Sequence, residues 1–287
     1  MRILATIVSA ALLTACATIA GAPPARLAAD PFYRKHVDAA RIPILSSARV
    51  PDAALFAARD MVRGMLAHRP DLAAWLVSND YRIALISRDE ALLDLPENAN
   101  WTKPARDDPR LTRCELKHYD ERIGSKTDRE YWDERARGIG GERMVGSEED
   151  VLGLPISRYW GETIFVHEFA HNVLFAIEGV DPGLYERVTA AYANALANDL
   201  WFEEYTTTTM QEYWAEGTQF WFNSNRLQAF DGRRILNARD LADYDPQLYA
   251  VLAEAYGDSH ELGSDPFYMH PARVPPGPPP VNTAEVC

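Results

Sequence analysis

The sequence predicts an α+β fold that is mostly helical and carries a small sheet. Apolar residues recur at helical spacing in several long stretches, whereas one short stretch alternates polar and apolar residues as a strand does. Hydrophobic residues make up 47% of the 287 positions, which is enough for a large core. The formal charge of −13 argues against a basic phosphate-binding face, so nucleic acid is not an expected partner.

The first residues differ from the rest of the chain. Met1-Arg2 precedes an uncharged apolar stretch, residues 3–15, which is typical of a secretory signal and too short to span a membrane. Leu13-Thr14-Ala15-Cys16 ends it and is similar to the lipobox of bacterial lipoproteins, whose cysteine is lipidated and becomes the first residue. An ordinary signal-peptidase cut after Ala20-Gly21-Ala22 is the alternative. We therefore expect an extracytoplasmic protein, either anchored to the membrane through lipid on Cys16 or periplasmic or secreted.

The composition of the sequence predicts that the chain has four parts. Residues 1–22 are the expected signal peptide, and the Pro- and Ala-rich residues 23–50 an expected tether. Residues 51–270 are expected to form one domain. Residues 271–287 contain Pro275-Pro276-Gly277-Pro278-Pro279-Pro280 and predict a polyproline tail with no core to join.

The expected elements of the domain follow in chain order. Residues 52–79 predict two helices, because His68-Arg69-Pro70-Asp71 interrupts their apolar spacing, and residues 81–87 predict a strand. Further helices are expected over about 160–178, 184–200, 209–225 and 240–256, with Gly179 as a left-handed cap of the first of these.

Residues 97–150 lack sustained periodicity and are dense in charge, glycine and proline. An irregular stretch of this length inside a compact domain is usually functional or disordered. Its glycine cluster, residues 137–141, has no strand-to-helix setting for a phosphate loop, so we interpret it as a turn.

The residues with the clearest chemistry are His167-Glu168-Phe169-Ala170-His171, an H-E-x-x-H pattern inside an apolar run. Positions i and i+4 share one face of a helix, so both imidazoles can reach one metal ion, and Zn²⁺ binds imidazole nitrogen well. Glu168 is placed to accept a proton from a water molecule that the metal activates. The alternative is an amphipathic core helix with two hydrogen-bonded histidines.

A catalytic zinc needs a third protein ligand, and Glu212 is the best candidate. It precedes Glu216 by four residues, so one carboxylate can bind metal while the other orients a histidine. Thr209 with Glu212 also forms a capping-box pattern, in which Glu212 would serve only the helix start. Thr208 with Gln211 offers the same box one residue earlier and leaves Glu212 free, which is the register we favour.

This combination resembles the gluzincin zinc metallopeptidases. Over about residues 155–225, the chain is most similar to the catalytic domain of the anthrax-lethal-factor type. The similarity lies in the forty residues between His171 and Glu212 and in the sequence Glu212-Tyr213-Trp214-Ala215-Glu216. The resemblance implies a zincin-like fold, one Zn²⁺ per chain held by His167, His171 and Glu212, Glu168 as general base, and Glu216 as a supporting acid. It also implies an oxyanion donor at Tyr205, seven residues before Glu212, where an ordinary half-buried tyrosine is the alternative.

The expected function is that of an exported zinc-dependent peptidase, with a peptide or protein as substrate and no membrane contact beyond the lipid on Cys16. One alternative is a binding or surface protein that keeps the zincin fold without turnover. A second is an acidic interaction module whose histidines bind no metal. The remaining cysteines, Cys114 and Cys287, are either one disulfide or two free thiols.

Overall fold

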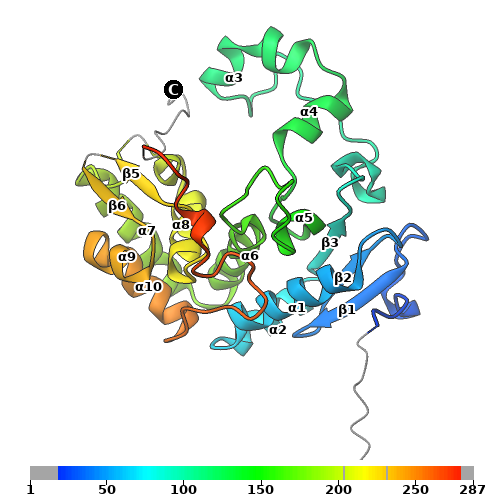
Figure 1. Cartoon of the computed structure of the whole chain (residues 1–287), viewed down its shortest axis with the longest axis horizontal. Helices are drawn as coiled ribbons and strands as arrows, with labels where there is room; N and C mark the ends of the chain where they lie inside the picture. Colours follow the sequence, from blue (N-terminus) through cyan, green and yellow to red (C-terminus); the bar gives the residue numbers. More distant parts are fainter. Residues whose placement is uncertain (1–18, 203, 231, 279–287) are drawn as a thin grey trace, which may run out of the picture.

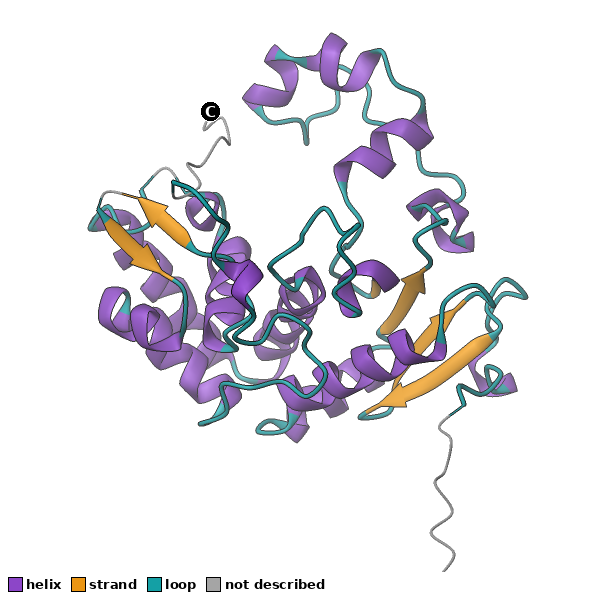
Figure 2. Cartoon of the chain, in the orientation of Figure 1, coloured by secondary structure: helices purple, strands orange, loops and turns teal. Residues whose placement is uncertain are grey.

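A four-stranded sheet lies on one side of the molecule and a group of helices on the other (Figures 1 and 2). The computed structural model describes residues 19–202, 204–230 and 232–278. The strand order is β1-β2-β3-β4, with β1 antiparallel to β2 and the remaining neighbours parallel. The strands are β1 (Lys35–Ala39), β2 (Ile42–Ser46), β3 (Arg82–Ile86) and β4 (Arg143–Ser147). The predicted α+β class is confirmed.

The first two strands correct the predicted tether over residues 23–50. Residues 35–46 form a β-hairpin that buries Val37, Ile42 and Ile44 in the core. Its turn is made by Ala40 and Arg41, which have φ values of 48° and 73°. Such turns usually carry Asn-Gly or Asp-Gly, so this hairpin lacks the usual sequence signal. Residues 1–18, which include Cys16 and most of the predicted signal over residues 1–22, lie outside the described residues.

Helices α1 (Asp52–Leu66) and α2 (Pro70–Ser78) confirm the predicted pair, and β3 confirms the predicted strand. Helix α6 (Ile164–Val180) carries the histidine motif and begins four residues later than expected. The helix starts late because Gly161, with a φ of +102°, lies in a turn where the sequence predicted the first residues of the helix. The helix starts where Asp150 accepts the amide hydrogens of Ile164 and Phe165, at 3.2 and 2.8 Å. Asp150 thereby satisfies two of the free N–H groups at this helix end.

Gly179 is not the helix cap that the sequence predicted. It lies inside α6, and a Cβ placed there would be 2.3 Å from Nε1 of Trp75. The glycine is therefore required by the close approach of α2 and not by a left-handed backbone.

The later helices follow the prediction with one exception. The expected helix over 240–256 is two helices, because Pro246 disfavours the helical conformation at Asp245 (φ −130°, ψ 77°) and starts a new helix. These are α9 (Ala238–Tyr244) and α10 (Pro246–Tyr256), and they follow α7 (Pro182–Ala197), α8 (Met210–Trp221) and the hairpin β5 (Gln228–Phe230) and β6 (Arg233–Ile235). None of the helices in the described part of the chain has the length and apolar character needed to cross a bilayer.

Residues 97–150 are more ordered than the sequence predicted. They contribute β4 and form the arch of short helices at the top of Figure 1. The arch consists of α3 (Arg113–Lys117), the π-helical turn Asp120–Gly124 and α4 (Asp128–Arg135). Helix α5 (Glu148–Val151) follows β4 and lies beside α6. Cys114 in α3 is buried and disulfide-bonded.

The chain after α10 corrects the prediction of a tail without a core. Arg273 in the short helical turn Pro271–Arg273 is only 2% exposed. Its Nε donates to the carbonyl of Asn225 at 2.7 Å, and its own carbonyl accepts the amide hydrogen of Leu227 at 2.8 Å. The turn Pro271–Arg273 is therefore fixed on the body of the molecule, and residues 279–287 of the predicted tail lie outside the described residues.

Candidate metal centre

Helices α6 and α8 bring the three predicted metal ligands together. His167 and His171 lie one turn apart on α6, and Glu212 lies in the first turn of α8. Glu212 Oε2 is 2.9 Å from His167 Nε2 and 3.8 Å from His171 Nε2. The three ligand atoms all lie within 4.8 Å of one another, as ligands of a single ion must. The structure therefore brings together the three residues that the sequence analysis singled out.

The charges at this site favour a bound cation. Burial lowers the pKa of His167, but hydrogen bonds to Glu212 and Glu216 outweigh it and leave the pKa well above its usual value. Burial raises the pKa of Glu212, and its bond to His167 outweighs that effect and lowers it. A carboxylate that stabilises a proton on His167 stabilises a metal ion in its place, with release of the proton. Imidazole nitrogen and carboxylate oxygen are donors suited to a divalent transition metal.

His171 is suited to metal binding in a different way. Its burial, followed by the charge of His167, lowers its pKa to about 4. The ring is therefore neutral at pH 7 and keeps a lone pair for a metal ion.

Gln219 fixes the orientation of His167, a role that the sequence analysis missed. Its Nε2 donates to the carbonyl of Thr163 at 3.1 Å, so its Oε1 is turned to His167 Nδ1, also at 3.1 Å. An amide oxygen only accepts, so Nδ1 donates to Gln219 and Nε2 is the ring nitrogen turned toward Glu212, to which it donates at 2.9 Å. Loss of the proton on Nε2 would leave its lone pair for a metal ion. Gln219 follows Glu216 by three residues on the same helix face, which was the available signal.

Glu216 lies where a supporting acid was expected. Its Oε1 is 3.4 Å from His167 Nδ1, a longer contact than that of Gln219. Its Oε2 accepts hydrogen bonds from Asn225 at 2.8 Å and Gln228 at 2.9 Å. These two amides hold the carboxylate beside His167.

The start of α8 differs from the register that we favoured. Thr209, and not Thr208, caps the helix, because its Oγ1 accepts the amide hydrogen of Glu212 at 3.1 Å. The side chain of Glu212 nevertheless reaches His167. The backbone of Glu212 therefore serves the cap while its carboxylate remains available to a metal.

Glu168 lies beside the candidate ligands and lines a cavity of about 1010 Å³ together with His167. Burial raises the pKa of its carboxyl group, and the charge of His167 partly offsets this. A raised pKa brings a carboxylate closer to the range in which it exchanges protons at neutral pH. Glu168 therefore lines the cavity with a carboxyl pKa above its usual value.

The glycine cluster over residues 137–141 is not an isolated turn. Ile139 pairs with Val145 in an antiparallel bridge, which extends the sheet beside the metal ligands. A Cβ on Gly138 would lie 3.0 Å from Glu168 Cγ, and one on Gly140 would lie 3.0 Å from the Cβ of His171. The two glycines are two residues apart, so they share one face of an extended segment. They allow the segment to lie directly against Glu168.

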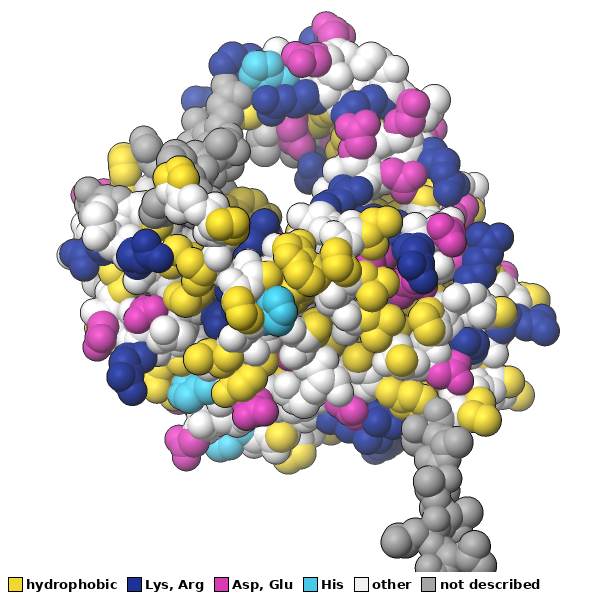
Figure 3. Space-filling view, in the orientation of Figure 1, with side chains coloured by type: hydrophobic (Ala, Val, Ile, Leu, Met, Phe, Trp, Pro, Cys, Tyr) yellow, Lys and Arg dark blue, Asp and Glu magenta, His cyan; other side chains and the backbone are white. Residues whose placement is uncertain are grey.

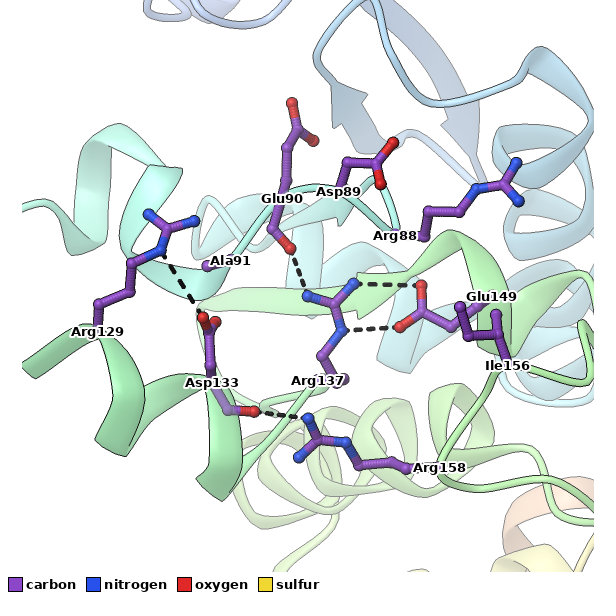
Figure 4. Close-up of a pocket in the computed structure, with 10 residues that line it drawn as sticks. All are labelled: Arg88, Asp89, Glu90, Ala91, Arg129, Asp133, Arg137, Glu149, Ile156 and Arg158. Carbon is purple, nitrogen blue, oxygen red and sulfur yellow. Dashed lines mark hydrogen bonds and ion pairs between the residues drawn. The ribbon is translucent and has the colours of Figure 1, made fainter. Parts of the chain in front are cut away.

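Arg137 anchors this segment (Figure 4). Its guanidinium binds Glu149 at 2.7 Å, the carbonyl of Ser87 at 3.0 Å and the carbonyl of Glu90. The surrounding cavity, about 350 Å³, has three further arginines in its lining. Each of them has its own partner: Arg88 binds Glu148, Arg129 binds Asp94, and Arg158 binds main-chain carbonyls of α4. All four arginines that line this second cavity are therefore engaged by the protein itself, and Arg137 holds the glycine segment in place.

Tyr205 lies at the rim of the site in the short helical turn Tyr205–Thr207. The residue is 45% exposed, and its ring centroid is 6.5 Å from that of His167. Burial of the hydroxyl end, the charge of Glu212 and a hydrogen bond to that carboxylate raise its pKa. The hydroxyl therefore stays protonated and can donate a hydrogen bond.

Comparisons with known proteins add a likeness of architecture. The sequence matches no protein-family model and no curated protein. Among solved structures, the chain is similar to the Pro-Pro endopeptidase PPEP-2 from Paenibacillus alvei, with a TM-score of 0.48 and 15% sequence identity. The similarity covers 74% of this chain and 96% of that one. The resemblance to the lethal-factor type stays a prediction.

Proposed function

We propose that the chain is a zinc-dependent peptidase that hydrolyses peptide bonds. The observation that carries this proposal is the position of Glu168. It lies next to a cluster of His167, His171 and Glu212, whose ligand atoms lie within 4.8 Å of one another, and it lines the same cavity as His167. A site that only stabilised the fold would hold four protein ligands and would not need a base beside the metal.

Each residue has a defined task in this proposal. His167, His171 and Glu212 would hold Zn²⁺, which when bound polarises a carbonyl group and lowers the pKa of water. Glu168 accepts the proton of the attacking water and then passes it to the leaving amine. The hydroxyl of Tyr205 donates a hydrogen bond to the oxygen that gains negative charge. Gln219 and Glu216 hold His167 in place.

The test is cleavage of a diverse peptide library by the purified, zinc-loaded protein, with fragments identified by mass spectrometry. We expect new amino termini at peptide bonds, loss of cleavage with a chelator, and its return when Zn²⁺ is added back. A protein that binds one zinc but cuts no peptide would support instead a catalytically silent binding protein with this fold.

We further propose that the protein is exported and anchored through lipid on Cys16. The pairing of Gly21 with His36 supports this, because their two backbone hydrogen bonds, at 3.2 and 2.7 Å, attach the entering chain to β1. A cut before Cys16 keeps Gly21 in the mature chain, whereas a cut after Ala22 removes it. Mass spectrometry of the native N-terminus should find a lipid-modified Cys16, and an unmodified chain starting at Pro23 would contradict this proposal.

A further inference from the structure

The segment Pro271–Pro276 forms part of the wall of the cavity that contains Glu168. Arg273 fixes it through the carbonyls of Asn225 and Leu236. The loop before α6 packs against the same segment, since a Cβ on Gly161 would lie 2.5 Å from the carbonyl oxygen of Ala272. This wall is therefore held in position before any ligand binds.

The wall presents apolar surface to the cavity. Val274 is 41% exposed and lines it together with Pro275 and Pro276. Trp160 is 37% exposed, and its ring is held edge-on by Phe267, with 5.2 Å between the centroids. Exposed hydrophobic side chains cluster on the face of the molecule drawn in Figure 3.

The apolar wall is close to the proposed chemistry along α6. Ile164 lines the same cavity and precedes His167 by three residues and Glu168 by four, so the three side chains share one face of the helix. Apolar side chains that line a concave site beside reactive groups are typical of a ligand subsite, because an apolar ligand group releases the water that covers them.

We propose that Trp160, Ile164 and Val274-Pro275-Pro276 form a subsite for a large apolar side chain of the peptide substrate. This inference rests on the proposed peptidase function, because the occupant is the peptide to be cut. Two of the acids that line the cavity are already engaged by neighbouring side chains. Glu162 is paired with Arg226, and Glu216 is held by two amides.

The test uses hexapeptides of alanine in which one position is Phe, Leu, Lys, Asp or Ala, scanned along the peptide. Cleavage is measured with the zinc-loaded wild type, and binding is measured by calorimetry with zinc-loaded Glu168→Gln. We expect Phe and Leu peptides to be preferred about 10-fold or more over the all-alanine peptide at one position, the usual discrimination of an apolar pocket. Trp160→Ala and Val274→Ala should each remove most of that preference, measured as the ratio of Phe or Leu peptide cleavage to all-alanine peptide cleavage by the same variant.

Two further variants make the result specific. Ile156→Ala removes another exposed aliphatic side chain, 69% exposed and outside this cavity, and should change nothing. Val274→Asp should move the preference toward Lys, because it places a carboxylate on the same wall. An unchanged Phe and Leu preference in both alanine variants, or a Lys preference in the wild type, would overturn the subsite. Apolar peptides that bind Glu168→Gln but are not cut by the wild type would keep the subsite and refute the peptidase function.

Discussion

Replacing Glu168 by glutamine should lower kcat/KM for peptide cleavage by about 10²–10⁴-fold, the usual contribution of a general base. The change keeps the shape of the side chain and removes the oxygen that accepts the proton. Zinc content should survive, because Glu168 lies outside the cluster formed by His167, His171 and Glu212. Steady-state kinetics together with elemental analysis test both statements on one preparation.

Tyr205→Phe is the matched comparison for this result. It removes one hydroxyl at the rim of the same site, and we expect a smaller loss than for Glu168→Gln, again with zinc intact. If Glu168→Gln cuts a peptide as fast as the wild type, the proton-transfer role assigned to Glu168 is wrong.

Removing a candidate ligand should have the second large effect. We expect close to one zinc per chain in the wild type, and a sharp fall of zinc content and cleavage in His167→Ala and Glu212→Ala. Each change leaves the metal short of a ligand. Each also leaves the other member of the 2.9 Å pair between His167 and Glu212 without its partner. A wild-type chain that stays metal-free and folded when zinc is offered would refute the metal site.

Gln219→Met should weaken zinc binding less than the loss of a ligand does, because Gln219 contacts His167 and is not itself a candidate ligand. It keeps the size of the side chain but loses the oxygen that faces His167 Nδ1. We expect zinc affinity to fall by about 10–100-fold, the usual effect of losing a partner that orients a ligating histidine. Competition with a chelator of known affinity measures the change. An unchanged affinity would show that Gln219 does not orient His167.

The candidate site was more predictable from the sequence than its surroundings. His167 and His171 follow the period of a single helix, and Glu212 with Glu216 repeats that spacing, so local geometry alone places each pair. Gly140 could not be placed in this way. Its contact with His171 depends on the bridge between Ile139 and Val145, which the sequence does not encode as a local pattern.

The structure near either end of the described chain was not predicted from the sequence, because neither end carries the local pattern that usually marks its structure. The hairpin over residues 35–46 has a turn of Ala40 and Arg41 without the residues that usually mark one. Arg273 is buried through its bond to Asn225, forty-eight residues earlier in the chain. Proline content predicts an extended backbone but not the surface on which it lies.

The position of the Pro271–Pro276 wall has a consequence for the order in which the protein is completed. The chain emerges from the ribosome with its N-terminus first, and all three candidate metal ligands have been made once Glu212 is added. The wall follows only after about sixty further residues have been made. A growing chain therefore contains the candidate metal ligands before the wall of the cleft has been made. If both the metal site and the subsite are correct, the residues that select the substrate are made after those that bind the metal.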